Sequence, residues 1–348
     1  MQKKNILLIL TGGTICSFAT DKGEQASDTG KAQALIVHNF KNSNCKYRDR
    51  VDFSCKFPLD ILSENMTITH WNTLAKELKG YDFSSYDGVI ILHGTDTLAY
   101  SAALLSVLLA GTPVPVILVS SQLPIYNEKA NGNANFKAAV ELIVNGIQPN
   151  IYAVYRNDEI INGQPTQTMY VHYAAHLLQC GSYSNNFYSS DMTSVSSENA
   201  MFSGKKCHST EMLINDTRLV KLCANILKIE PYPGIDYSKY LLDGVDAVIH
   251  GTYHSYTVPT TTPSVEQSVL YLKELCDKSS SAIPLFIEPC SKSTYETTGI
   301  ALRAGIIPIA NLTSEMLYAK VVVGCSMGLS SAALTDFINT NINDEFLI

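Results

Sequence analysis

Two short polar motifs in the first hundred residues carry side chains that can do covalent chemistry. The first, Thr-Gly-Gly-Thr-Ile at residues 11–15, places a threonine hydroxyl beside two glycines whose backbone amides can approach a ligand closely. A nucleophile next to an oxyanion hole can be assembled in this way. The second, His-Gly-Thr-Asp-Thr at residues 93–97, sets a hydroxyl next to a carboxylate, which suits the binding of an ammonium group.

Each motif also has a purely structural interpretation. A tight turn after a strand would account for residues 11–15, and their spacing matches neither of the glycine-rich phosphate-binding patterns. Thr95, Asp96 or Thr97 could cap a helix that begins at this point, although a cap needs only one of the three. The residues alone therefore leave a structural and a catalytic interpretation open.

The elements that would position these motifs follow from the pattern of apolar residues. Uninterrupted Val, Ile and Leu runs are typical of strands buried on both faces, and such runs occupy residues 5–10, 88–92, 114–119 and 150–155. Helical spacing occurs between them, at residues 69–78, 97–110 and 135–144. This alternation predicts a mostly parallel sheet. Because parallel strands end at one edge, we expect residues 11–14, 93–97 and 120–122 to converge on one pocket.

A change in composition divides the chain. Serine becomes frequent between residues 182 and 209, and a second series of strand and helix patterns follows. We therefore predict an α/β protein with an N-terminal parallel-sheet domain, Rossmann- or flavodoxin-like, at residues 1–190. A linker is predicted at residues 191–214 and a smaller C-terminal α/β domain at residues 215–348.

Composition and charge exclude several classes of protein. The 348 residues are 46% hydrophobic and 16% charged, which excludes disordered, coiled-coil and fibrous proteins. A net charge of −7, with no basic stripe, argues against nucleic acid as a partner. The nine cysteines show no CxxC spacing, and the apolar run near the N-terminus is too short for a signal or membrane segment. We expect a cytoplasmic protein with reduced thiols and no membrane partner.

The ordered pair of motifs resembles the bacterial-type L-asparaginase/glutaminase family. Further segments follow the order of that family: YDGVIILHGTDTLAY at residues 86–100, PVILVSSQLP at 115–124 and GIALRAGIIPIANLTSEML at 299–317. The first fifteen residues are similar to the cytoplasmic type I branch.

This resemblance implies a role for each of five residues. Thr14 matches the nucleophile that forms a β-aspartyl ester, and Thr95 and Asp96 match the threonine and acid that assist catalysis and bind the substrate α-amino group. Ser63 matches the serine that binds the α-carboxylate, with Glu64 beside it. The implied reaction is hydrolysis of L-asparagine to L-aspartate and ammonia, without a cofactor or metal. The resemblance also implies a homodimer or homotetramer.

Two positions depart from the family pattern. Glu24 stands where family members usually carry a tyrosine, and Thr168 stands where they carry a lysine that pairs with the acid of the second motif. Loss of that cation removes one influence that activates the nucleophile. We expect Glu24, enclosed when residues 17–30 close, or water held by Thr95 and Asp96 to take the proton instead. Two alternatives remain: an amino-acid-binding or regulatory protein with weak or no hydrolysis, or an amidase for another small amide.

Other short motifs do not support a different chemistry. Gly-Cys-Ser-Met-Gly at residues 324–328 has the spacing of a hydrolase elbow, but no histidine follows it, since the last one is His254. His172 and His176 are four residues apart, as are His250 and His254, without the glutamate that zinc proteases require. We predict no metal site from these histidines.

Overall fold

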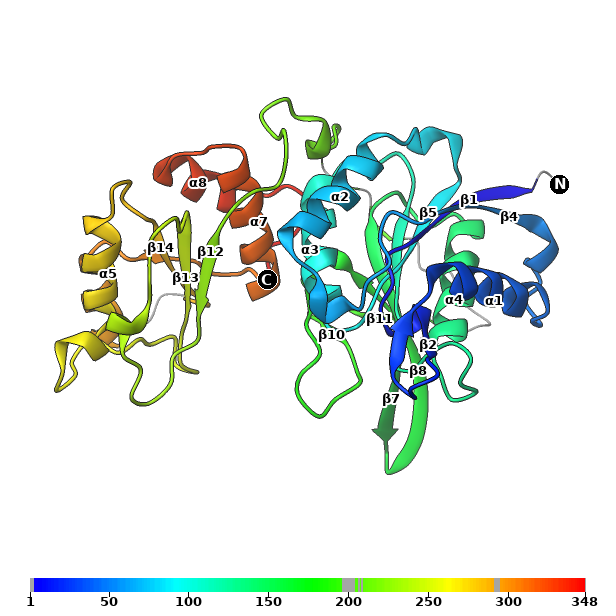
Figure 1. Ribbon diagram of the computed structural model, residues 1–348, viewed down its shortest axis with the longest axis horizontal. Coiled ribbons are helices and arrows are strands. Elements are labelled where there is room, and N and C mark those ends of the chain that lie inside the picture. Colours follow the sequence, from blue (N-terminus) through cyan, green and yellow to red (C-terminus); the bar gives the residue numbers. More distant parts are fainter. Residues whose placement is uncertain (1–2, 196–203, 206, 208, 291–294, 348) are drawn as a thin grey trace. The chain divides into compact units, whose positions relative to one another are not determined.

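The computed structural model describes residues 3–195, 204–205, 207, 209–290 and 295–347. The chain forms two compact units (Figure 1). The first comprises Met1–Lys221 with Ile342–Glu345, and the second comprises Leu222–Asn341 with Phe346–Ile348.

A seven-stranded sheet forms the centre of the first unit, in the order β11-β8-β7-β6-β5-β1-β4. Strands β4, β1, β5, β6 and β7 are parallel to one another, whereas β8 pairs antiparallel with β7, and β11 pairs antiparallel with β8. Numbered along the chain, the parallel strands have the order 2-1-3-4-5 of flavodoxin-like folds. The strands are β1 (Lys4–Leu10), β4 (Val51–Lys56), β5 (Gly88–Leu92), β6 (Val116–Val119), β7 (Ile151–Ile161), β8 (Gln164–Tyr173) and β11 (Thr193–Ser194).

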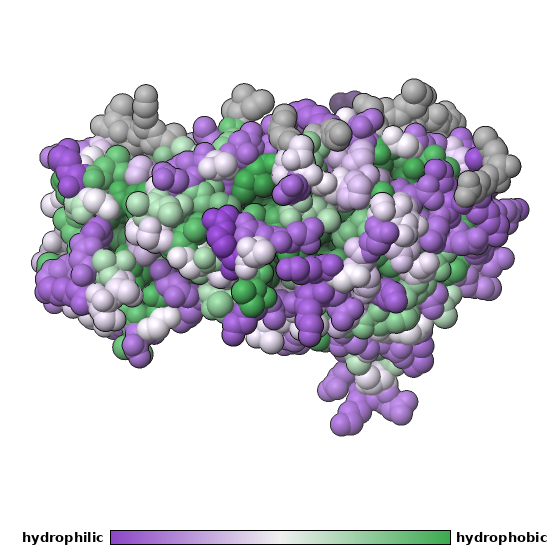
Figure 2. Space-filling model, turned by 90° about the horizontal axis from the view of Figure 1, so that it is seen from above, coloured by the Kyte–Doolittle hydropathy of each residue, from purple (hydrophilic) through white to green (hydrophobic). Residues whose placement is uncertain are grey.

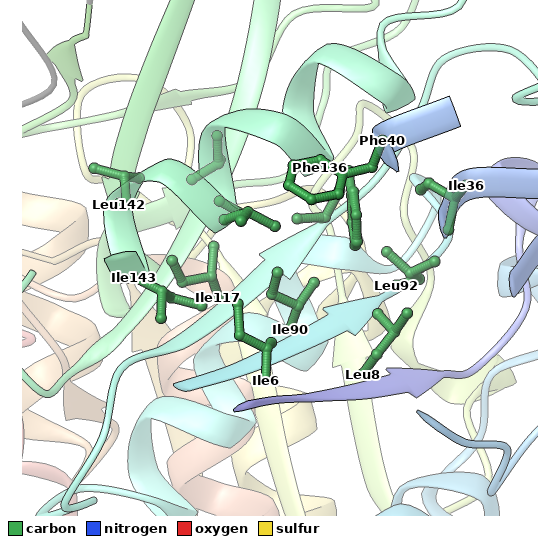
Figure 3. Packing of buried hydrophobic residues seen from close by; sticks show 14 of the residues in the cluster. Ile6, Leu8, Ile36, Phe40, Ile90, Leu92, Ile117, Phe136, Leu142 and Ile143 are labelled. Carbon is green, nitrogen blue, oxygen red and sulfur yellow. The ribbon is translucent and has the colours of Figure 1, made fainter. Parts of the chain in front are cut away.

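The apolar runs form buried strands, as the sequence predicts. All of β5 and β6 and the last five residues of β1 are buried. In Figure 3, side chains from these strands, among them Ile6, Ile90 and Ile117, form one buried cluster with Phe40 of helix α1 (Thr29–Lys41) and Phe136 of helix α4 (Gly132–Val144). Burial on both faces explains why these strands lack alternation.

The described residues of the first unit form four α-helices: α1 (Thr29–Lys41), α2 (Ile68–Lys79), α3 (Leu98–Leu108) and α4 (Gly132–Val144). In Figure 1, α1 and α4 lie on one side of the sheet and α2 and α3 on the other. Helix α3 is buried almost all round. The sequence predicts α2, α3 and α4 within a few residues; α1 and strand β4 are additions that the structure reveals.

A long hairpin is the main departure from the predicted parallel sheet. Strand β7 continues past the predicted residue 155 to Ile161, and β8 returns antiparallel to it. Asn162 and Gly163 form the two-residue turn with φ of 52° and 77°, the backbone that an Asn-Gly hairpin turn adopts. Shorter antiparallel pairs are β2 (Ser17–Ala19) with β3 (Gln25–Ser27), and β9 (Leu177–Leu178) with β10 (Tyr188–Ser189).

The second unit is built on a four-stranded parallel sheet in chain order, which confirms an α/β fold throughout. Its strands are β12 (Ile226–Ile229), β13 (Ala247–Gly251), β14 (Leu285–Glu288) and β15 (Ile307–Pro308). Its helices are α5 (Val269–Lys278), α6 (Glu296–Arg303), α7 (Ser314–Ser326) and α8 (Ser331–Ile338). Its own core includes Tyr237, Val248, Leu272 and Ile287.

The visible surface mixes residue types. Figure 2 shows hydrophilic residues interspersed with hydrophobic ones over the face in view, as is usual for folded proteins. Within the described part of the chain, no helix combines the length and apolar character needed to cross a membrane.

Candidate active site

Glycines bring the two polar motifs into direct contact at the carboxyl ends of β1 and β5. A methyl group on Gly13 would lie 2.1 Å from the Cα of Gly94, and one on Gly94 would lie 2.3 Å from the Oγ of Ser63. Gly13 also has a φ of 82°, and its amide donates to the carbonyl of Ile61 at 2.7 Å. Only glycine fits such approaches without displacing the backbone. In this strand order, β1 and β5 flank the switch point where ligands bind.

Ser63 and Asp96 form a reciprocal pair across these loops. The Ser63 hydroxyl donates to Oδ2 of Asp96 at 2.6 Å and accepts from the Asp96 amide at 3.2 Å. The Thr97 hydroxyl donates to the carbonyl of Ser63 at 3.0 Å. Ser63 is buried at the start of a short 3-10 turn (Ser63–Asn65), whereas Asp96 and Glu64 are exposed. The structure thus holds the Asp96 carboxylate in one orientation while it remains accessible.

Thr14 begins a short 3-10 turn (Thr14–Cys16) that follows directly on Gly13. Its side chain is half-buried, and the next two residues, Ile15 and Cys16, are buried. Burial raises the pKa of the Cys16 thiol to about 12, so this thiol stays protonated and is a poor nucleophile. Thr14 is thus the most accessible residue of this turn.

A cavity of about 300 Å³ lies beside Thr95 and Asp96. Most of its wall comes from the loop between β9 and β10, and Asp96 is the one charged side chain among the described residues that line it. Thr14, Ser63 and Glu64 are outside this lining. The lining residues are Thr95, Asp96, Gln122, Tyr155, Gln179, Cys180, Gly181, Ser184, Asn185 and Phe187.

Two buried groups, His93 in the second motif and Tyr155 in the cavity lining, are held neutral. Burial lowers the pKa of His93, whose Nδ1 lies 2.8 Å from the carbonyl of Gly94 and donates to it as the neutral ring. Burial likewise raises the pKa of Tyr155 to about 12, with its ring edge-on to Phe187. Neither group adds a charge beside Asp96.

The two departures from the family pattern lie outside this lining. Glu24 is exposed at the turn between β2 and β3, where its carbonyl accepts from the Thr20 amide at 2.7 Å. Thr168 lies on β8, opposite Asn157 of β7. Neither residue brings a charge to the lining. Glu24 is exposed, and its enclosure on closure of residues 17–30 stays a prediction.

Several residues of the other short motifs have structural partners. The Ser326 hydroxyl donates to the carbonyl of Val322, one turn earlier in α7, at 2.7 Å. His172 is buried on β8, and burial lowers its pKa to about 4; His176 lies 3.0 Å from Asp191. Among the residues that the structure describes, no three His, Cys, Asp or Glu side chains converge as metal ligands would.

Comparison with known proteins identifies the family. Residues 5–179, which include both glycine-containing motifs, match the family model described as Asparaginase, N-terminal. The chain belongs to the asparaginase family. This confirms the resemblance seen in its motifs.

Relatives of this asparaginase-family chain include two kinds of enzyme. It is 25% identical over 329 residues to the L-asparaginase of Thermococcus kodakarensis, covering 91% of each protein. It is 23% identical to a Glutamyl-tRNA(Gln) amidotransferase subunit of Methanosphaera stadtmanae, covering 99% of this chain and 77% of the relative. A solved structure of the thermostable T. kodakarensis L-asparaginase has the same fold, with a TM-score of 0.72, 20% identity and 99% coverage of both chains.

Proposed function

We propose that this protein hydrolyses L-asparagine to L-aspartate and ammonia, with Thr14 as the nucleophile. The observation that carries the proposal is the contact among the turn at Gly13, the loop at Gly94 and the Ser63–Asp96 pair. That contact brings the turn that precedes Thr14 and the loop that carries Asp96 together at the switch point of the sheet, which supports a site that uses both residues. Thr95 and Asp96 are proposed to assist catalysis and bind the α-amino group, and Ser63, with Glu64 beside it, the α-carboxylate.

The proposed reaction has two covalent steps. The Thr14 hydroxyl oxygen attacks the side-chain amide carbon, a C–O bond forms, and the C–N bond breaks as the nitrogen takes a proton and leaves as ammonia. Water then attacks the ester and returns the hydroxyl to Thr14. The oxyanion needs free backbone amides in both steps, and the amide of Gly13 is not one of them, because it donates to the carbonyl of Ile61.

Two observations favour other functions for the same site. The amidotransferase relatives suggest that the same site could release ammonia as part of a larger assembly with partner proteins. The lack of a cation at Thr168 supports weak hydrolysis and a binding role. A homo-oligomer and a cytoplasmic location are further parts of the proposal.

Ammonia release tests the proposal. Wild type is assayed with L-asparagine, L-glutamine and D-asparagine, together with Thr14→Ala and with Thr73→Ala as a matched control on the exposed face of α2. We expect Thr14→Ala to abolish release and Thr73→Ala to keep it. If Thr14→Ala released ammonia as fast as wild type, Thr14 could not be the nucleophile. Stabilisation of an inactive wild type by L-aspartate would identify a binding protein, because a ligand of the native state raises its stability.

A further inference from the structure

The Gln179 side chain makes two hydrogen bonds to the segment that contains Thr95 and Asp96. Its Nε2 donates to the carbonyl of Thr95 at 2.9 Å, and its Oε1 accepts from the amide of Ala99 at 3.2 Å. A carbonyl can only accept and an amide N–H can only donate, so the two contacts fix which end of the glutamine amide faces which partner.

The contact at Ala99 supplies a cap that the helix itself lacks. Thr97 is the N-cap of α3 but makes no side-chain cap bond, because its hydroxyl donates to Ser63 instead. The first amides of a helix have no partner within the helix. Gln179, eighty residues further along the chain, satisfies one of them at Ala99.

The contact at Thr95 acts on the site directly. Thr95, Asp96 and Gln179 line the same cavity, and Gln179 is half-buried in its wall. The side-chain amide of Gln179 therefore links Thr95, the residue before Asp96, to Ala99 in the first turn of α3. Small misplacements of a reacting group cost large factors in rate, so such a tie has kinetic consequences.

We propose that Gln179 is a positioning residue for the reaction at this site: it fixes the Thr95 carbonyl relative to the N-terminus of α3 and thereby orients Thr95 and Asp96 toward the substrate. This inference rests on the proposed function for its kinetic consequence. Gln179 itself is not assigned any contact with the substrate.

Replacement by glutamate tests the donor half of the tie. Gln179→Glu keeps an acceptor for Ala99 but, when ionised, has no proton to give Thr95. When protonated, its carboxyl group again has one donor and one acceptor, as the amide does. Gln179→Met removes both bonds at any pH. Gln164→Glu, an exposed position at the start of β8, is the matched control for the charge change.

At pH 8 we expect kcat to fall at least about tenfold in both Gln179 variants, while KM changes less than about threefold. The melting temperature of Gln179→Glu should equal that of wild type. As the pH falls toward 5, the ratio of Gln179→Glu to wild-type kcat should rise, while the Gln179→Met ratio stays flat. The proposal would be overturned if Gln179→Glu had the kcat of wild type at pH 8, or if its kcat ratio to wild type did not change with pH. A residue that only caps α3 predicts a wild-type kcat for Gln179→Glu at pH 8, because the glutamate keeps the acceptor for Ala99.

The positioning role is tested separately from the hydrolase itself. If wild type releases no ammonia, the proposed function fails, and the same pH comparison is made with the affinity for L-aspartate by calorimetry. If L-aspartate does not bind, hydrogen exchange at the Ala99 amide decides. Exchange is expected to be faster in Gln179→Met and as slow as wild type in Gln179→Glu; unchanged protection in Gln179→Met would refute the tie.

Discussion

Replacing Gly94 by alanine should disrupt the contact on which the site depends. The new methyl group would lie 2.3 Å from the Oγ of Ser63, 2.5 Å from its Cβ and 2.8 Å from the Cα of Gly13. Rotation of the Ser63 side chain could relieve the first contact, but the Cβ and the backbone of Gly13 cannot move without shifting both loops. The structure therefore predicts overpacking with loss of the Ser63–Asp96 hydrogen bond.

The expected cost combines two effects. Overpacking of a well-packed site costs roughly 1–3 kcal/mol. A hydrogen bond to a charged group contributes roughly 1.5–3 kcal/mol, and the lower end applies because Asp96 is exposed. Together the two terms amount to about 2.5–4.5 kcal/mol, and we expect Gly94→Ala to lose about 3 kcal/mol of unfolding free energy. Binding of L-aspartate should weaken at least about tenfold, since Ser63 and Asp96 are proposed to hold its α-groups.

Urea unfolding followed by tryptophan fluorescence measures this loss in the relevant unit. Trp71 is the single tryptophan of the chain and is buried on α2, where its Nε1 donates to Ser101 at 2.9 Å. Gly30→Ala is the matched control, because a methyl there meets only Asp28, at 3.6 Å, and should stabilise by at most about 1 kcal/mol. A Gly94→Ala protein within about 0.5 kcal/mol of wild type, with intact L-aspartate binding, would refute the reasoning.

Two further predictions concern pH. Burial alone would lower the pKa of His176, but Asp191 and Asp344, whose carbonyl lies 2.7 Å from Nε2, together raise it. A raised histidine pKa contributes its full stability below about pH 6.5 and less as the pH rises through the folded value. Asp191→Asn should therefore lower the Trp71 unfolding midpoint more at pH 6 than at pH 8.5, and equal losses would contradict the ion pair. Burial raises the pKa of Glu288 from 4.5 to about 7, although the Ser314 hydroxyl donates to its carboxyl group. The protonated carboxyl therefore favours folding fully below pH 4.5, and this contribution is lost as the pH rises to about 7. The loss in unfolding free energy is about 3 kcal/mol at ~1.36 kcal/mol per pH unit. Glu288→Gln should remove this slope from calorimetric scans of the second unit, and an unchanged slope would reject the assignment.

Much of the fold is legible in local sequence patterns. Uninterrupted apolar runs identify β1, β5 and β6 because a strand covered on both faces has no polar side to show. The β7–β8 hairpin does not follow from such runs, although Asn162-Gly163 carries its turn signal. Most residues between 156 and 168 are polar and lack the apolar pattern of the earlier strands. The sequence thus describes the buried sheet better than the exposed hairpin.

The site divides in the same way. Glycine pairs and the hydroxyl–carboxylate motif mark Thr14, Thr95 and Asp96 from sequence, since these residue types have few other uses at the ends of buried strands. The roles given to these residues remain predictions. The Ser63–Asp96 hydrogen bond has no signal in the sequence, and Gln179 lies in a stretch that resembles ordinary packing material.

Residue type and order were enough to establish the α/β class, the family and the two motifs, because burial on both faces and backbone freedom at glycine are properties of short stretches of chain. Long-range hydrogen bonding is different. Which side chain satisfies the amide of Ala99, and which hydroxyl holds Asp96, depends on segments that are distant in the chain and that meet only once the sheet has formed. A glutamine has the same local signature in a surface loop as in the wall of a cavity, so its role becomes visible only when its partners are in place.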